Sequence, residues 1–213
     1  MSQPYRPANG PEVEMNKDKT ILHLCADIGS DSQPYRDAGY NVICVGKDQD
    51  VRTYKPPDYV YGIIANPPCT EFSFAATNPK SGPRDFDGAL SIIRGCLRVI
   101  WECQTRIESR AQKRPPLKFW MLENPQGMLE WFLGKPAARY NPYEFGEVYQ
   151  KRTCLWGQFN MPEPSGIKHP KPKKFDKLLT HEIAPEYRGK LTRQERRSVC
   201  SANFAKAFFE ANI

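Results

Sequence analysis

The sequence predicts an α/β fold in which a mostly parallel central sheet carries helices on both faces. Short apolar runs alternate along the chain with segments of helical periodicity. Two of these runs end at prolines, and the first two runs enclose a glycine-containing turn. In sheets of this class ligands bind beyond the carboxyl ends of the strands, so the loops that follow the apolar runs are expected to converge on one crevice.

The first part of the chain has the pattern of a βαβ unit. TILHLC (20–25) is expected to be a strand, a helical segment follows and ends at Gly39, and NVICVG (41–46) is expected to be the second strand. YVYGIIANPP (59–68) then predicts a third strand, which the two prolines terminate.

The middle of the chain continues the alternation. Residues 87–112 have apolar side chains at helical spacing and predict a long amphipathic helix, with an apolar face formed by Leu90, Ile93, Leu97, Ile100 and Trp101. LKFWMLENP (117–125) predicts a fourth strand, and KRTCLWGQF (151–159) is a candidate for a fifth.

With 213 residues, of which 39% are hydrophobic, the chain is expected to form one core with appendages. We expect a flexible arm at 1–18, a catalytic domain at 19–160 and an extended segment rich in proline and lysine at 161–190. Residues 191–213 are expected to form a helix that docks on the core through one face, which carries Phe204, Ala207, Phe208 and Ala211.

The composition narrows the functional classes. The formal charge of +7 and the pI near 9.0 favour an anionic partner such as nucleic acid. Seven scattered cysteines without a C-x-x-C pair, and only three histidines, argue against a metal site or a disulfide framework, and favour buried thiols at Cys25, Cys44, Cys96 and Cys103. No apolar run reaches 18 residues and the N-terminus lacks the apolar core of a secretion signal, so we expect a cytoplasmic protein without a membrane partner.

The cysteine of NPPCTEFS (66–73) is the candidate nucleophile. Two prolines fix the backbone directly before Cys69, which would hold its thiol in one orientation. The alternative is a buried cysteine after a turn that ends a strand. Glu123 follows the apolar residues FWML, and burial there would raise its pKa and suit it to hold a proton; the alternative is a cap of the next turn.

Taken in order, ADIGS, PPC, ENP and QKRTCLWG resemble the motifs of the DNA cytosine-5 methyltransferases, particularly the short phage-type members. The resemblance covers roughly residues 20 to 160, and SVCSANFAKAFFEAN is similar to the closing segment of that family. It implies a Rossmann-like methyltransferase fold, DNA as the substrate, S-adenosylmethionine as the methyl donor, and the cytoplasm of a host cell as the setting.

The resemblance also assigns roles to residues of the reaction. It implies that Cys69 adds covalently to carbon 6 of cytosine, that Glu123 bonds ring nitrogen 3 and the 4-amino group, and that Arg152 bonds the base oxygen. Further residues are expected to contact the substrate, namely Pro68, Asn124, Gln150 and the lysines Lys171, Lys173 and Lys174, although the lysines could equally belong to a surface linker.

For the donor, the resemblance implies a pocket formed by the turn after the first strand and by acids after the second, with Asp48 on the ribose and Asp50 on the adenine. The donor contacts expected in total are Asp27, Ile28, Gly29, Asp48, Asp50 and Pro67.

Three departures from the family keep other functions open. Asp27 stands where a glycine is usual, Cys154 stands where a second arginine is usual, and only about 40 residues separate Phe159 from the last helix, where the family inserts a longer target-recognition region. The alternatives are a cytosine C5-modifying enzyme with an altered donor or a nucleotide substrate, and a catalytically degenerate relative that binds nucleic acid.

Overall fold

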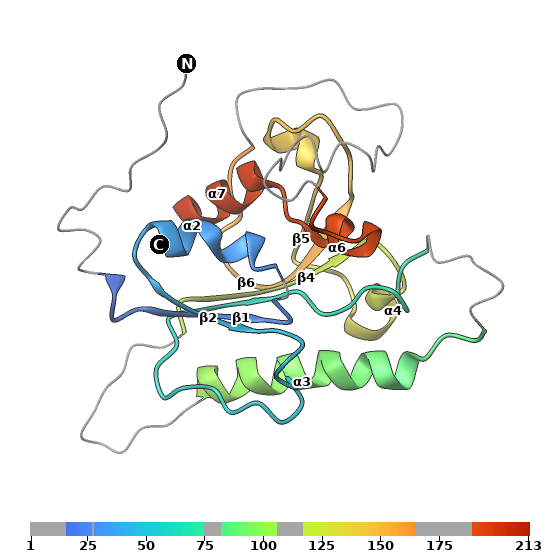
Figure 1. Ribbon diagram of the computed structural model, residues 1–213, viewed down its shortest axis with the longest axis horizontal. Coiled ribbons are helices and arrows are strands. Elements are labelled where there is room, and N and C mark those ends of the chain that lie inside the picture. The colour runs from blue at the N-terminus through green and yellow to red at the C-terminus, as the bar shows by residue number, and fades with distance from the viewer. Residues whose placement is uncertain (1–15, 27, 75–81, 106–116, 165–188) are drawn as a thin grey trace.

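The computed structural model describes residues 16–26, 28–74, 82–105, 117–164 and 189–213. Within these ranges the chain forms a six-stranded sheet in the order β2-β1-β3-β4-β6-β5 (Figure 1). Strands β1 to β4 are parallel, and β6 runs antiparallel to both β4 and β5. The strands are β1 (Thr20–Leu24), β2 (Asn41–Val45), β3 (Gly62–Ala65), β4 (Phe119–Pro125), β5 (Ala138–Tyr140) and β6 (Thr153–Gln158).

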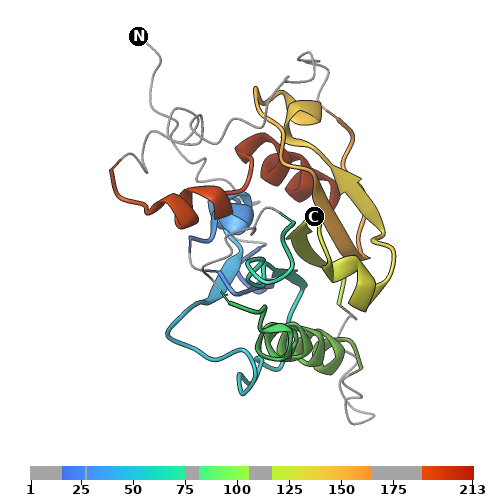
Figure 2. The same cartoon turned by 90° about the vertical axis from the view of Figure 1, so that its right-hand side faces the viewer.

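Helices cover both faces of this sheet. The long helix α3 lies on one face, and α2 and α7 lie on the other (Figure 1); Figure 2 views α3 nearly end-on and shows the same layers. The predicted α/β class, a mostly parallel sheet with helices on both faces, is confirmed. The helices are α2 (Gln33–Asp37), α3 (Phe86–Thr105), α4 (Leu129–Leu133), α6 (Arg193–Ser198) and α7 (Ala202–Ala211), with 3-10 turns η1 (Ser30–Ser32) and η3 (Pro142–Phe145).

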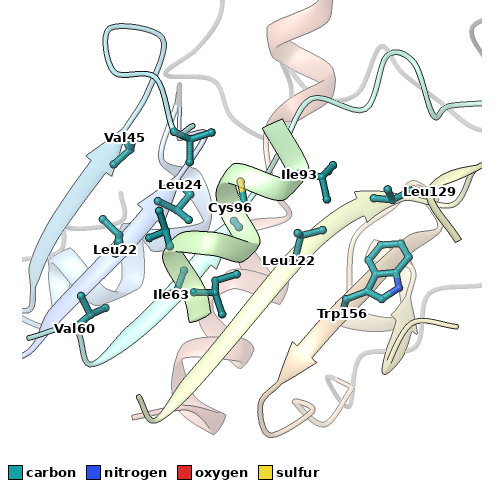
Figure 3. Close-up of a cluster of buried hydrophobic side chains, with 14 of the residues drawn as sticks. Leu22, Leu24, Val45, Val60, Ile63, Ile93, Cys96, Leu122, Leu129 and Trp156 are labelled. Atoms are coloured by element: carbon teal, nitrogen blue, oxygen red, sulfur yellow. The ribbon is translucent and has the colours of Figure 1, made fainter. Parts of the chain in front are cut away.

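The core between the sheet and α3 is aliphatic. Alternate strand residues such as Leu22, Ile63 and Leu122 point to this face, and Ile93 and Cys96 of α3 pack on them (Figure 3). All five are at most 2% exposed. Because successive side chains of a strand point to opposite faces, the residues between them are directed to a second core.

The second core, under α2 and α7, is aromatic. Phe119 of β4 stacks on Tyr35 of α2 and meets Phe208 of α7 edge to face. Phe204 of α7 stacks on Tyr140 of β5 with ring centroids 3.6 Å apart. The terminal helix α7 therefore contributes much of the buried area on this face of the sheet, since aromatic side chains contribute the largest buried areas of any residue type.

The strand register brings three strand ends to one level. Leu24 of β1 pairs with Ala65 of β3, and Ala65 pairs with Leu122 of β4. The next residues along the chain are Cys25, Asn66 and Glu123 respectively. Cys25 and Asn66 follow the ends of β1 and β3, and Glu123 continues β4 beside them. The loops that carry the candidate site thus start from adjacent positions at one edge.

Several local predictions differ from the structure. Trp101, predicted on the apolar face of the long helix, is 65% exposed, because the face of α3 that meets the sheet passes through Ile93, Val99 and Ile100 instead. Of the four cysteines predicted to be buried, Cys96 is buried, whereas Cys25, Cys44 and Cys103 are only partly so.

The C-terminal segment contains two helices where one was predicted. The side chain of Thr192 accepts a hydrogen bond from the backbone N–H of Glu195 and starts α6, and Ser201 does the same for Phe204 and starts α7. Serine and threonine are strong N-cap residues, so Ser201 begins a new helix rather than continuing the old one. Among the helices described here, none combines the length and the apolar character that a membrane crossing requires.

We predict that Phe204→Ala lowers the free energy of unfolding by about 3–5 kcal/mol, the usual cost of emptying a buried aromatic site. Chemical denaturation followed by circular dichroism measures this change. The control is Ile213→Ala, because Ile213 is 66% exposed, and its effect should stay within about 0.5 kcal/mol. Equal effects of the two substitutions would show that α7 contributes little to the core.

Candidate functional site

The side chain of Asn66 connects three segments at the carboxyl edge of the sheet. Its amide nitrogen lies 3.3 Å from a carboxylate oxygen of Asp31 in η1 and 3.4 Å from one of Glu123 in β4. Its amide oxygen lies 2.7 Å from Nε2 of His23 in β1. Asn66 directly precedes the two prolines and Cys69, so this network sets where the cysteine loop begins.

His23 supports Asn66 as a neutral ring. Burial lowers the pKa of His23, and the opposing effect of Asp31 is smaller, so the imidazole carries a single N–H near neutral pH. The oxygen of Asn66 can only accept, which assigns that N–H to Nε2. The Oγ of Ser32 lies 2.8 Å from Nδ1 and 3.1 Å from the carbonyl of Gly29, which are the two acceptors for its single proton. The ring thereby fixes both Asn66 and the turn after β1.

Glu123 is a buried carboxyl next to one cation. Its pKa is raised by burial and further by the charge of Asp31, while Lys151 opposes the rise without cancelling it. The Nζ of Lys151 lies 3.5 Å from a carboxylate oxygen of Glu123, and the two side chains are 18% and 11% exposed. A carboxyl in this setting holds its proton to a higher pH than an exposed glutamate does.

The pKa of Lys151 also depends on the candidate nucleophile, Cys69. Burial by itself lowers the pKa of Lys151, but the neighbouring acidic groups, Glu123 foremost and Cys69 among them, outweigh it, and the net pKa is raised. The attraction is mutual, so the Lys151 ammonium stabilises a thiolate at Cys69. One cation therefore serves both the thiol and the carboxyl.

The cysteine loop is tied to the end of β4. The side-chain nitrogen of Asn124 donates to the carbonyl of Pro67 at 3.0 Å, and Pro67 is buried while Pro68 is exposed. The carbonyl of Cys69 accepts from the backbone N–H of Phe72 and of Ser73, so Cys69 begins a tight turn. Its thiol is partly buried.

The segment after β4 closes on the same turn. Ser73 and Gly127 form an isolated antiparallel bridge, and the N–H of Met128 donates to the carbonyl of Phe72 at 2.8 Å. A Cβ atom at Gly127 would overlap the Phe72 carbonyl, so the approach requires glycine here. The PPC and ENP segments therefore form one paired unit.

One acceptor in this unit has no partner among the described residues. The side-chain oxygen of Asn124 is buried and makes no hydrogen bond there. The opposite amide orientation would place two oxygens against each other at Pro67, so the orientation is secure. A buried acceptor of this kind is costly until a donor reaches it, and a ligand or a water molecule would supply one.

The turn after β1 brings a second acid to the crevice. Gly29 has φ 71° and begins η1, whose Asp31 is only 7% exposed. The C-terminal segment seals this turn, because the backbone N–H of Cys200 donates to Oγ of Ser30 at 3.0 Å. Burial raises the pKa of Cys200 well above its usual range, and Asp31 adds to the rise, so Cys200 is a neutral thiol there.

The predicted base-contacting residues take different positions. Cys69, Glu123 and Asn124 belong to the unit described above, and Gln150 is partly buried beside Lys151. Arg152 is exposed and donates to the side chain of Gln126 at 3.0 Å, so the structure does not place it on Glu123. In the described structure the cation on Glu123 is Lys151, whose Nζ lies 3.5 Å from the carboxylate, whereas Arg152 contacts Gln126.

The residues expected to bind the donor are spread over several segments of the chain. Asp48 is exposed in the turn after β2, and Asp50 is exposed and accepts hydrogen bonds from Nε and Nη2 of the Arg52 side chain. Lys47 of that turn pairs with Glu195 of α6 at 3.6 Å, so α6 reaches the end of β2. Ile28 is partly buried next to Gly29. Outside the described residues lie Asp27, Lys171, Lys173 and Lys174.

Sequence reasoning did not single out Lys151, Asn66, His23 or Cys200. Lys151 was passed over because the expected arginine was its neighbour, and only the contacts of the folded chain show which of the two faces Glu123. Asn66 carried a weak signal, as the polar residue directly before PPC. A histidine inside an apolar strand, such as His23 in TILHLC, is the one signal that could have been used.

Comparison with known proteins adds little. No family model matches this chain. No curated protein is similar to it in sequence. Among solved structures it is similar to a 23S rRNA methyltransferase, ErmE, with 10% identity and a TM-score of 0.29 over 94% of this chain and 95% of that one. A likeness of this degree carries no argument about function, which has to rest on the geometry of the site.

We predict that Lys151→Met raises the pKa of Glu123 further, because the substitution removes the charge that opposes the rise. A carboxyl whose folded pKa lies above its unfolded value destabilises the fold as it ionises. The free energy of unfolding of the variant should therefore fall more steeply as the pH rises above the range in which an ordinary glutamate ionises, with a deficit of about 3 kcal/mol once Glu123 is charged and unpaired. Carbon-13 titration of the glutamate carboxyls, together with denaturation at each pH, measures both effects.

The control for this experiment is Lys206→Met, which removes an exposed lysine that pairs with Glu210 at 3.8 Å. It should leave the titration of Glu123 unchanged. A Glu123 titration that is the same in the Lys151 variant as in the control would show that the buried ion pair does not exist in solution.

Proposed function

We propose that the protein is a cytosine-5 methyltransferase that acts on DNA through a covalent bond to Cys69. The observation that carries this proposal is the paired unit at the end of β3 and β4. In this unit the hydrogen bond from Asn124 to Pro67 holds the cysteine turn. The same unit contains the Glu123 carboxyl, which has a raised pKa and pairs with Lys151. Nucleophile, proton donor and charge partner are the three groups that conjugate addition to a pyrimidine requires.

Cys69 performs the first step. Its thiolate adds to carbon 6 of the cytosine ring, forming a sulfur–carbon bond while the electron pair of the double bond moves to carbon 5. Lys151 favours the thiolate, since the charge of Cys69 and that of Lys151 attract each other. The prolines before Cys69 reduce the freedom of the loop, so little entropy is lost when the thiol meets the ring.

Glu123 makes the ring accept the thiolate. A protonated carboxyl donates to ring nitrogen 3, which draws electrons from the ring as sulfur adds, and its other oxygen accepts from the 4-amino group. Burial raises the pKa of Glu123 so that this proton is present closer to neutral pH. Asn66 orients the carboxyl through its 3.4 Å contact.

The crevice suits a cationic methyl donor. Asp31 and Glu123 are both contacted by the amide of Asn66, and Lys151 pairs with Glu123. S-adenosylmethionine, when bound, supplies a methyl group from a sulfonium centre and adds a positive charge that Asp31 can attract. Gly29 and Asp31 in the turn after β1, with Pro67 beside them, are the residues that would hold it.

The chain then has to release its product. After carbon 5 takes the methyl group, its proton leaves to solvent, the ring double bond re-forms, and the bond between carbon 6 and sulfur breaks to return the Cys69 thiolate. The hydrogen bond between Glu123 and nitrogen 3 is released in the same step, so the Glu123 carboxyl and the Cys69 thiolate return to their starting states.

We predict that Cys69→Ser abolishes methyl transfer and that Glu123→Gln slows it about 10²- to 10⁴-fold, the usual range for loss of a proton donor. A hydroxyl at neutral pH is far less nucleophilic than a partly ionised thiol. The measurement is transfer of labelled methyl groups to cytosine-containing DNA, with product nucleosides identified by mass spectrometry.

The decisive companion assay is a covalent adduct with DNA that contains 5-fluorocytosine, formed in the presence of the donor and resistant to denaturation. Wild type and Cys103→Ser should form it, and Cys69→Ser should not. An adduct without methylated product would favour an altered donor. No adduct with any substrate, whether duplex, single strand or nucleotide, would contradict the covalent mechanism and favour a binding protein.

A further inference from the structure

A cluster of exposed aromatic side chains lies next to the cysteine turn. Phe74, Trp131 and Phe132, here called the aromatic platform, are 54%, 71% and 44% exposed. Phe74 meets Trp131 with ring centroids 6.2 Å apart. Large apolar side chains that gather on a surface in this way mark a binding site more often than isolated ones do.

The platform is held rigidly from below. Phe132 contacts the fully buried Phe72 and the partly buried Phe86, with centroids 5.9 and 5.5 Å away. In α4, Glu130 pairs with Arg139 at 2.6 Å and accepts from the thiol of Cys154. A platform fixed in this way loses little freedom when a ligand binds, which favours affinity.

The platform continues the candidate active site. Phe74 is the next residue after Ser73, whose bridge to Gly127 joins the cysteine turn to the segment that leads into α4. In Figure 1 α4 lies at the end of the sheet toward which β3 and β4 lead. A polymer whose target base enters the crevice would therefore pass its neighbouring units over the platform.

Two exposed cations contact or flank the chain segment that carries α4. Arg152 is exposed and donates to the neutral side chain of Gln126, and Lys135, two residues beyond α4, is exposed as well. The acid nearest to the rings in sequence, Glu130, is already paired with Arg139. Aromatic rings interleaved with cations are the arrangement that binds unpaired bases and their phosphates.

We propose that the aromatic platform stacks the unpaired bases that flank the target cytosine. That the stacked bases flank a target cytosine rests on the proposed function, whereas the stacking of unpaired bases on the platform does not. Three aromatic side chains of about 150–250 Å² each, only about half exposed, offer less area than the roughly 800 Å² that each partner gives to a standard protein interface. A nucleobase, by contrast, needs only one ring face.

The test compares two exposed tryptophans. Trp131→Ala removes the centre of the platform, and Trp101→Ala is the matched control, because Trp101 is 65% exposed on α3, which covers the body of the sheet. Affinity for a fluorescent, cytosine-containing single-stranded oligonucleotide is measured by anisotropy at several salt concentrations. Trp131→Ala should weaken binding about 5- to 150-fold, and Trp101→Ala should not.

Two further measurements distinguish base stacking from attraction between charges. The slope of log affinity against log salt should be unchanged in Trp131→Ala, since no phosphate contact is lost, and it should flatten in Arg152→Gln. Replacing the bases that flank the cytosine by abasic sites should weaken binding of the oligonucleotide to the wild-type protein. The same replacement should not weaken its binding to Trp131→Ala, which has already lost the stacking ring. Phe74→Ala, a second substitution at an exposed position, should reproduce the effect.

Equal affinities of the two tryptophan variants would overturn the proposal. So would a Trp131→Ala variant that binds the strand normally but turns from dimer to monomer in sedimentation, because the platform would then be an interface between two copies of the chain. The outcome is independent of catalysis: Cys69→Ser should keep the Trp131 dependence of binding, and a chain that stacks bases but forms no adduct would refute only the proposed function.

Discussion

The need to pair buried polar groups at the carboxyl edge of the sheet decides how the candidate site is built. Asn66 meets that need for three segments together, since its amide group contacts His23, Asp31 and Glu123. A buried polar group without a partner costs free energy, so these segments cannot shift separately. The position of the cysteine turn is thus a consequence of a hydrogen-bond network that starts inside β1.

The charges of the crevice obey a second constraint. Two carboxyl groups and one ammonium share a buried space, and the acids compete for a single cation. Burial favours the uncharged form of a carboxyl, which is why Glu123 has a raised pKa while it still pairs with Lys151. The same arrangement suits Glu123 to the proton-donor role proposed for it and leaves the lysine able to stabilise a thiolate.

The short helix α4 joins the crevice to the outer surface. Its first turn receives the backbone bond between Met128 and Phe72, and its end is fixed by the bond from Nε1 of Trp156 to the carbonyl of Gly134 at 2.9 Å. A helix of this length has little stability of its own, so its geometry comes from these contacts. The aromatic platform and the paired unit of the PPC and ENP segments consequently share one support.

The sequence by itself determined the fold class and the outline of the site. Apolar runs and turn residues are local signals, and they gave four parallel strands, the long helix and the order of the PPC and ENP segments. What the tertiary structure decided was which side chains meet. Lys151 rather than Arg152 faces Glu123, and Trp101 faces solvent, because strand pairing and helix rotation depend on contacts far apart in the chain. The network through His23 and Asn66 is of the same kind, since its partners are 43 residues apart.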